Sequence, residues 1–220
     1  MAPIVAAVGD ARSIVNVGAG TGSYEPPGVR VAVEPSWEMI KQRPAGAAPV
    51  VRGVAERLPV RHLEVALAVL TVHHWTDWRA GLAELRRVSD RQVVLAYDIA
   101  AHLEFWLVRE YLPEIAELGR TRPGAAEIAE ELGADNVIAL PLPWDFTDAV
   151  FPAHWRRPHA YLDPAVQRSN SALAQSDPAV LDRAMRALRA DLDSGAWAAR
   201  HADILAVDEY DAGFRLIVKG

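Results

Sequence analysis

The stretch Ile14-Val15-Asn16-Val17-Gly18-Ala19-Gly20-Thr21-Gly22-Ser23 decides the predicted fold of this chain. Its first four residues are mostly apolar and predict a strand buried on both faces. Glycine then stands at every second position, and because glycine lacks a Cβ it allows positive φ and close approach of a ligand to the backbone. Amide groups after such a turn can hold a polar ligand. We therefore predict a ligand-binding turn over 18–22.

A second apolar run, Val29 to Val33, follows the turn and ends on Glu34. A carboxylate at the tip of a neighbouring strand suits a ribose, because it can accept hydrogen bonds from both hydroxyls of the diol. A glycine turn followed by an acid at the next strand end therefore indicates a nucleoside cofactor.

The spacing of the glycines narrows the kind of cofactor. A dinucleotide site favours G-x-G-x-x-G, whereas this chain has G-x-G-x-G with Ser23 and Tyr24 in the places beyond it. A G-K-[S/T] sequence does not follow, which leaves phosphate binding with little support.

Two later motifs add to the turn and the acid: Gly53-Val54-Ala55-Glu56-Arg57-Leu58-Pro59 and His73-His74-Trp75. Together the motifs resemble the class I S-adenosyl-L-methionine (SAM)-dependent methyltransferases, most closely the UbiE-like or type 11 small-molecule group. The resemblance covers residues 12 to 98. It implies an α/β, Rossmann-like, doubly wound seven-stranded sheet whose last strand is antiparallel. It also implies SAM as cofactor, with S-adenosyl-L-homocysteine as product, and methyl transfer to a small-molecule acceptor.

The length and composition of the chain restrict the classes of protein to which it can belong. The chain has 220 residues, which suits one α/β domain with an insert, and it has no cysteine for disulfides or thiolate chemistry. Its formal charge of −6 argues against a nucleic-acid partner. Apolar runs fall short of the ~20 residues of a membrane span, and the apolar start is too short for a signal peptide. We expect a cytoplasmic monomer or homodimer without a membrane partner.

Periodicity and turn residues predict the other elements. Pro26-Pro27-Gly28 excludes a first helix of ordinary length. Pro35-Ser36 opens a helix running to about Arg43, with Met39 and Ile40 facing inward, and Thr76 or Asp77 caps the next. Further helices are expected over His102 to Gly119, with a kink or split at Pro113, and over Thr121 to Gly133. Strands are expected at Val50-Val51, Val65–Leu70, Arg91–Asp98, Val137–Leu142 and Phe214–Val218, the last paired with Ile204–Val207 or with the sixth strand.

Residues 143–203 form a helical insert before the last strand, while 1–142 and 204–220 form the SAM-binding α/β core. Asp163-Pro164 and Asp177-Pro178 each place a capping acid before a proline that opens a helix. Relatives generally join these strands by a tight hairpin and carry an N-terminal helical lid, so we expect the insert to supply the acceptor-site lid. Its aromatic residues either line the acceptor or pack the insert onto the sheet: Trp144, Trp155, Tyr161 and Trp197.

The resemblance assigns a set of residues to the cofactor. They are Gly18, Ala19, Gly20, Thr21, Gly22, Glu34, Pro35, Ser36, Met39, Ala55, Glu56, Leu70 and Thr71. Two assignments keep an alternative: Met39 as core filling, and Glu56 as a solvated loop carboxylate. Val54 stands where the group usually has an Asp, so the adenine-side contact falls to the Ala55 amide or the Glu56 side chain.

Methyl transfer is an in-line displacement in which the protein mainly aligns the acceptor and excludes water. An oxygen or nitrogen acceptor also loses a proton, and histidine titrates in the suitable range. We expect His73 or His74 to be the base, with Asp98 as its orienting partner. Substrate contacts are expected from Tyr24, Trp75, Phe105, Trp106 and Trp155. A metal site is not expected, because no H-x-x-x-H or H-E-x-x-H spacing occurs.

Two other functions stay open. A methyltransferase-like binding or regulatory protein would keep the fold without turnover. An NAD(P)-dependent oxidoreductase would use a similar fold with another cofactor. Fold alone does not separate these possibilities.

Overall fold

The computed structural model describes residues 1–116, 121–148 and 150–220. The chain forms two compact units: residues 1–98, 123–140 and 214–220 make the first, and 99–122 and 141–213 make the second. This division differs from the predicted insert of 143–203. The second unit also takes in 99–122, because Phe105 and Trp106 pack on its aromatic side chains, with ring centroids of Trp106 and Trp197 5.2 Å apart.

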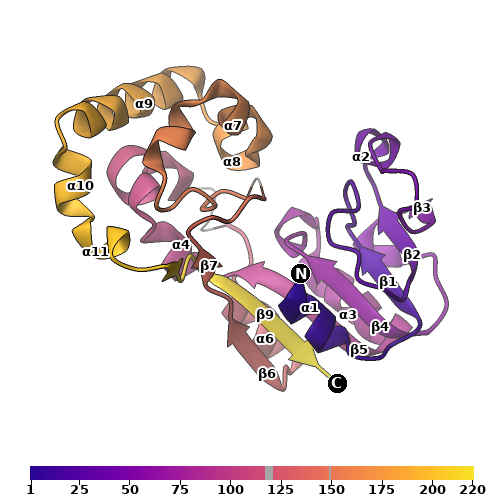
Figure 1. Ribbon diagram of the computed structural model, residues 1–220. Coiled ribbons are helices and arrows are strands. Elements are labelled where there is room, and N and C mark those ends of the chain that lie inside the picture. The colour runs from indigo at the N-terminus through magenta and orange to yellow at the C-terminus, as the bar shows by residue number, and fades with distance from the viewer. Residues whose placement is uncertain (117–120, 149) are drawn as a thin grey trace. The chain divides into compact units, whose positions relative to one another are not determined.

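The first unit is built on one sheet. Within the described residues, seven strands follow the order β3-β2-β1-β4-β5-β9-β6 (Figure 1). Neighbouring strands run parallel from β3 to β5, and β9 is antiparallel to both β5 and β6. The predicted doubly wound sheet with an antiparallel last strand is thereby confirmed. The strands are β1 (Ile14–Val17), β2 (Val29–Glu34), β3 (Val50–Arg52), β4 (Leu63–Val69), β5 (Ser89–Tyr97), β6 (Asn136–Ala139) and β9 (Phe214–Lys219).

The central strands are apolar because both of their faces are covered. All four residues of β1 are buried, as are the last five of β4. Asn16 of β1 lies opposite Ala32 on one side and Leu67 on the other. Because parallel strands end at the same edge of a sheet, the glycine turn, Glu34 and the residues after β4 and β5 reach that edge together.

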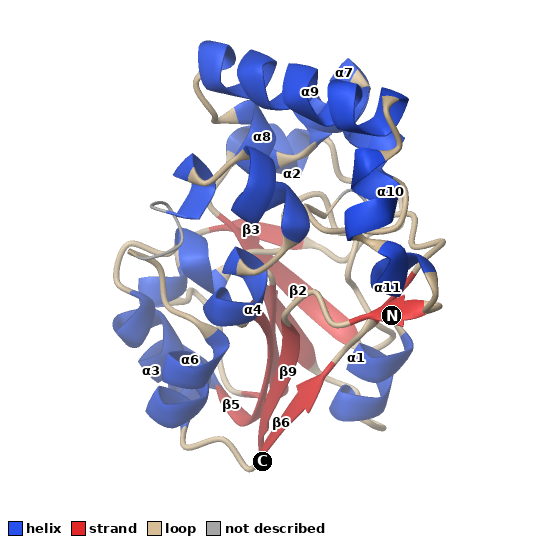
Figure 2. Cartoon of the chain, turned by 90° about the vertical axis from the view of Figure 1, so that its left-hand side faces the viewer, coloured by secondary structure: helices blue, strands red, loops and turns tan. Residues whose placement is uncertain are grey.

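Helices cover the two faces of this sheet. Helix α3 (Trp78–Val88) packs on β4 and β5 and α6 (Ala125–Leu132) on β9, whereas α1 (Ala2–Val8) lies on the opposite face (Figure 2). As predicted, Asp77 caps α3 by accepting a hydrogen bond from the Ala80 amide at 3.0 Å. The predicted apolar stripe of α3 is fully buried, and it consists of Leu82, Leu85 and Val88.

Turns alone connect β1 to β2, with no helix among the described residues 18–28. This agrees with the prediction from Pro26-Pro27-Gly28. Gly28 has φ +97°, and a Cβ there would lie 2.4 Å from the Ala11 carbonyl oxygen, so only glycine fits.

Helix α2 (Trp37–Lys41) is shorter than predicted and does not face inward. Ser36 is its cap, which places Pro35 outside the helix rather than in its first turn, and Met39 is 44% exposed. The expectation that Met39 faces inward, including its alternative as core filling, is wrong. The helix stops before Arg43 because Pro44 follows, and a helix of this length buries none of its own side chains.

In the second unit, the helix predicted from His102 is divided into α4 (Ile99–Leu103) and a π-helical turn, η3 (Leu107–Tyr111). The predicted split at Pro113 is confirmed, because η3 is capped by Leu112 directly before it, whereas the break after α4 was not predicted. This break lets Phe105 and Trp106 turn into the core, where both are at most 1% exposed. The predicted end at Gly119 lies outside the described residues.

The rest of the second unit is mainly helical. Asp163 caps α7 and Asp177 caps α9, each through a carboxylate that accepts from a first-turn amide, as predicted. Ile204–Val207 is not a strand, because Ile204 and Leu205 belong to the helix α11, and β9 pairs with β6, which ends before the predicted Leu142. The remaining elements are β7 (Leu142–Pro143), η4 (Pro158–Leu162), α7 (Pro164–Ser169), α8 (Ser171–Ala174), α9 (Pro178–Asp193), α10 (Ala196–Arg200), α11 (Ala202–Leu205) and β8 (Glu209–Tyr210).

Candidate functional site

The glycine turn requires its glycines for different reasons. Gly18, Gly20 and Gly22 all have positive φ, at +67°, +54° and +89°. A Cβ on Gly18 would lie 1.9 Å from Thr71 Oγ1, whereas a Cβ on Gly20 would meet no atom within 4 Å. Gly18 is therefore packed against the end of β4, and Gly20 leaves open space above the turn.

Four amides of this turn donate hydrogen bonds within the chain. The amides of Gly18 and Ala19 donate to the Val33 carbonyl oxygen at 2.8 and 3.2 Å, and the Gly22 amide donates to the Ala19 carbonyl oxygen at 2.9 Å. The Gly20 amide donates to Glu34. These donors were expected to hold a ligand, yet they are already engaged. The turn thus offers a ligand mainly its shape, because the carbonyl oxygens of Ala19 and Gly20 also accept hydrogen bonds within the chain.

Glu34 joins the turn to the end of β2. Its carboxylate accepts hydrogen bonds from the Gly20 amide through Oε2 and from the Ser36 amide through Oε1, both at 2.8 Å. The residue is only 6% exposed. A carboxylate has about four lone-pair sites, so each oxygen can accept one more hydrogen bond. The structure therefore places the predicted residues Gly20, Glu34 and Ser36 together.

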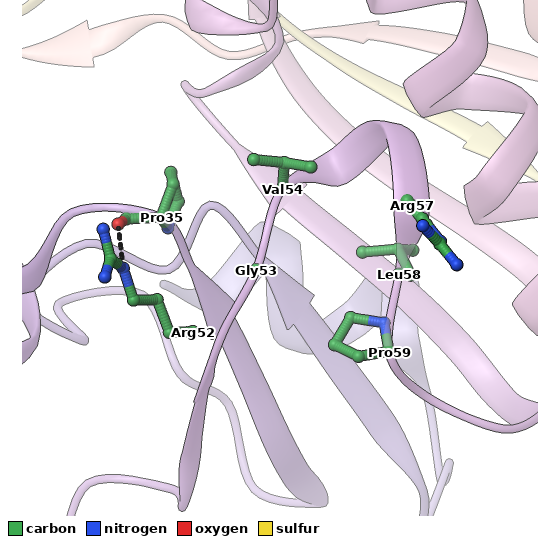
Figure 3. Close-up of a pocket in the computed structure, with 7 residues that line it drawn as sticks. All are labelled: Pro35, Arg52, Gly53, Val54, Arg57, Leu58 and Pro59. Atoms are coloured by element: carbon green, nitrogen blue, oxygen red, sulfur yellow. Dashed lines mark hydrogen bonds between the residues drawn. The ribbon is translucent and has the colours of Figure 1, made fainter.

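Pro35, which follows Glu34 in the chain, lines a hollow of about 670 Å³ (Figure 3). Proline and aliphatic side chains supply much of its wall, and Val54 is 47% exposed there. Arg52 lies at one side and donates from Nε to the Pro35 carbonyl oxygen at 3.2 Å. The lining residues are Pro35, Arg52, Gly53, Val54, Arg57, Leu58 and Pro59.

Glu56 has a structural partner. Its Oε1 accepts hydrogen bonds from the amides of Thr76 and Asp77 at 2.8 and 3.1 Å, which fixes the chain just before α3. Glu56 is therefore not the solvated loop carboxylate that the sequence left open as an alternative. Ala55 is buried at the start of the short 3₁₀ turn η1 (Ala55–Arg57). Both residues lie between hollow-lining neighbours, but they do not line the hollow themselves.

The chain after β4 is held in a sparsely populated conformation. Leu70 has φ +52°, the one positive φ of a non-glycine residue in the described parts of the chain, and its amide donates to the Leu95 carbonyl oxygen at 2.8 Å. Such backbone strain is common at functional sites. Thr71 Oγ1 accepts a hydrogen bond from Trp75 Nε1 at 3.3 Å, and the Trp75 ring packs on Gly81. Trp75, predicted to touch substrate, thus shapes this loop.

His73 and His74 lie in the 3₁₀ turn η2 (Val72–His74), with ring centroids 4.0 Å apart. His74 is exposed, whereas His73 is half-buried and meets the Tyr97 ring edge-on at 5.7 Å. Burial raises the pKa of the Tyr97 phenol, and the charge of Tyr24 adds to the shift. Sequence reasoning missed Tyr97, although it ends β5 directly before Asp98.

Asp98 is engaged with an arginine of the last strand. Its carboxylate accepts a hydrogen bond from Arg215 Nη2 of β9 at 3.1 Å, and its pairing with a histidine stays a prediction. Arg215 was also missed, because its place opposite Ala96 depends on the pairing of β9 with β5.

Most of the tryptophan residues of the second unit, together with Phe105 and Tyr161, lie in its core. Trp106 donates from Nε1 to the Trp155 carbonyl oxygen at 2.9 Å, and Trp155 donates to the Pro143 carbonyl oxygen at 3.3 Å. Tyr161 and Trp197 are at most 2% exposed, and Trp144 is 45% exposed. Phe105, Trp106 and Trp155, which were predicted to touch substrate, are therefore packing residues within their own unit.

The described residues include no helix long and apolar enough to cross a membrane. They also include no group of three or more His, Cys, Asp or Glu side chains that could hold a metal ion.

The fold of this chain is similar to those of solved methyltransferase structures. A protein of Anabaena variabilis, described as a candidate methyltransferase from an antibiotic biosynthesis pathway, matches 100% of this chain and 95% of its own. The TM-score is 0.91 at 27% identity. This chain has the SAM-dependent methyltransferase fold. The resemblance read from the motifs is thereby confirmed.

More distant methyltransferases share the fold alone. A SAM-dependent methyltransferase of Thermotoga maritima matches 68% of this chain and 75% of its own, with 24% identity and a TM-score of 0.51. A candidate sarcosine dimethylglycine methyltransferase of Galdieria sulphuraria matches 99% and 81%, with 11% identity and a TM-score of 0.54. No family model and no curated protein sequence matches the chain significantly.

The full-length match extends the likeness beyond the sheet. It includes residues 143–203, the insert that relatives were expected to replace by a tight hairpin, so this segment has a counterpart in the Anabaena protein. Within the first unit of this methyltransferase fold, the glycine turn, Glu34 and the hollow beside Pro35 all lie at the carboxyl ends of the parallel strands. That is where open α/β sheets bind ligands.

Proposed function

We propose that this protein is a SAM-dependent methyltransferase for a small-molecule acceptor. Glu34 binds the two ribose hydroxyls, the turn of Gly18 to Gly22 takes the methionine end, and the hollow beside Pro35 takes the adenine. The observation that carries this proposal is the Glu34 carboxylate, which is buried, tied to the Gly20 amide and still able to accept two hydrogen bonds.

The walls of the hollow support the place given to the adenine. A purine ring presents two flat faces and suits apolar side chains, and Pro35, Val54 and Pro59 supply such surfaces. The Ala55 amide and Glu56 take no part in this assignment, because Glu56 holds the start of α3.

When bound, SAM supplies an electrophilic methyl group whose bond to sulfur breaks as the bond to the acceptor forms, and the electron pair stays on sulfur. The protein has to align the acceptor and exclude water. For an oxygen or nitrogen acceptor, we assign proton removal to His73. It is half-buried and packed on Tyr97, whereas His74 is exposed and Asp98 is paired with Arg215.

The acceptor is proposed to be a small product of specialised metabolism. The Anabaena protein, which matches this chain over its full length, is described as belonging to an antibiotic biosynthesis pathway. We assign the acceptor lid to the second unit, residues 99–122 and 141–213, whose aromatic core would give it a rigid body.

Calorimetric titration with SAM, S-adenosyl-L-homocysteine and NAD tests the cofactor first. We expect micromolar binding of the first two and none of NAD; binding of NAD alone would favour an oxidoreductase instead. SAM carrying a labelled methyl group, offered with a panel of hydroxyl, amine and carbon acceptors, then tests turnover. Tight SAM binding without labelled product across the panel would favour a non-catalytic SAM-binding protein.

A further inference from the structure

A buried ion pair lies against the glycine turn. Arg43, just after α2, pairs with Glu25, and their side chains are only 5% and 10% exposed. Both residues belong to the first unit. The other carboxylate oxygen of Glu25 accepts a hydrogen bond from the Ala48 amide at 2.9 Å, and Arg43 Nη2 donates to the Ala48 carbonyl oxygen at 3.1 Å.

The guanidinium of Arg43 also reaches the turn itself. Nη1 donates to the Gly20 carbonyl oxygen at 3.3 Å. A Cβ on Gly22 would lie 3.2 Å from the same nitrogen, so the arginine lies directly against this glycine. On its other side, Gly20 donates its amide proton to Glu34. Gly20 is thus held through its N–H by an acid and through its C=O by an arginine.

Stability alone does not account for such a pair. Burying two charges carries a desolvation cost that their attraction roughly offsets, so apolar residues of similar size would serve the fold as well. The contact with Gly20 is different, because an apolar residue cannot donate to a carbonyl oxygen. In many nucleotide sites the helix after the first strand steadies the phosphate-binding turn, and residues 18–28 of this chain have no such helix among those described.

We propose that Arg43, neutralised by Glu25, is a positioning residue for the cofactor site. It fixes the Gly20–Thr21 peptide and with it the backbone of Gly20, whose amide donates to Glu34, so that the Glu34 carboxylate keeps the orientation in which its remaining lone pairs face the ribose. Arg43 acts through Gly20 and does not touch the cofactor. This inference rests on the proposed SAM binding.

The test compares a single with a double variant. Arg43→Met leaves the buried Glu25 carboxylate without its arginine, so both the unfolding midpoint in urea and SAM affinity should fall. Adding Glu25→Gln removes that charge and keeps an acceptor for the Ala48 amide, which should restore most of the midpoint. A positioning role predicts that the SAM Kd of the double variant stays at least tenfold above that of the wild type. A Kd that recovers along with the midpoint would overturn the inference.

The matched control is the Glu38–Lys41 pair of the adjacent helix, which is exposed. Lys41→Met should change neither the midpoint nor SAM affinity. Hydrogen exchange of the ligand-free protein gives a readout that does not require SAM to bind. Amides in the peptide covering 18–23 should exchange at least tenfold faster in the double variant, and unchanged exchange would contradict the inference. A wild type that fails to bind SAM would instead refute the proposed function.

Discussion

Replacing Glu34 with alanine tests the cofactor site most directly. The carboxylate accepts hydrogen bonds from the amides of Gly20 and Ser36, and hydrogen bonds to a charged group contribute about 1.5 to 3 kcal/mol each. Both amides lie on half-buried residues, where water replaces part of what is lost. We therefore expect the free energy of unfolding to fall by about 2 to 3 kcal/mol rather than by the full sum of two bonds.

The effect on binding is separate. In the proposed complex both ribose hydroxyls donate to Glu34, and neither finds an acceptor in the alanine variant. We expect SAM affinity to fall at least tenfold, or about 1.4 kcal/mol. Calorimetric titration well below the unfolding midpoint, with urea unfolding in parallel, measures the two quantities on the same protein.

Glu64→Ala is the matched control. The Glu64 carboxylate also accepts from two backbone amides, those of Arg12 and Ser13, but it lies near the start of β4, at the opposite end of the sheet. This variant should lose stability and keep SAM affinity. If folded Glu34→Ala bound SAM within twofold of the wild type, the assignment of the ribose to Glu34 would be refuted.

Three further outcomes are expected. Gly18→Ala should lower the free energy of unfolding by well over the ~1 kcal/mol of an unfavourable φ, because its Cβ would overlap Thr71. Gly20→Ala should lower it by only about that amount, because its Cβ meets no atom. Equal losses of stability in urea unfolding would contradict this packing. Glu56→Gln should lower the unfolding midpoint and leave the SAM Kd unchanged, so a weakened Kd would return Glu56 to the cofactor site. Burial lowers the pKa of His102 to about 4, so the unfolded chain takes up the proton first and the free energy of unfolding should fall between pH 6.5 and 4, by about 3 kcal/mol. His102→Phe should flatten that part of the curve, and an identical slope would speak against the shift.

The parallel core was predictable because its signals are local. Each strand from Ile14 to Asp98 is a short apolar run bounded by a turn, and the acid at Glu34 follows its strand directly. In the second unit, an aspartate followed by proline correctly predicted the start of two helices, α7 and α9. These features depend on residues within a few positions of one another, so periodicity and turn chemistry suffice to find them.

The features that the sequence analysis predicted wrongly or missed depend on contacts between residues far apart in the chain. The helix predicted from His102 breaks so that Phe105 can pack on Tyr161 and Trp106 on Trp197, the latter some ninety residues away in the chain. Asp98 meets Arg215 only because β9 inserts between β5 and β6. The role of Arg43 could not be seen either, because an arginine after a short helix looks like any solvated surface charge.

The hydrogen bonds that Glu34 and Arg43 make to the backbone of Gly20 have an electrostatic consequence. The N–H that donates to Glu34 belongs to the Ala19–Gly20 peptide, and the C=O that accepts from Arg43 belongs to the Gly20–Thr21 peptide. Each charge therefore favours one orientation of one peptide dipole, and together they fix the two peptides on either side of the Gly20 Cα. Because the two charges are shielded from solvent, dissolved ions screen them little, and the shape of this turn should be almost indifferent to the salt concentration around the protein.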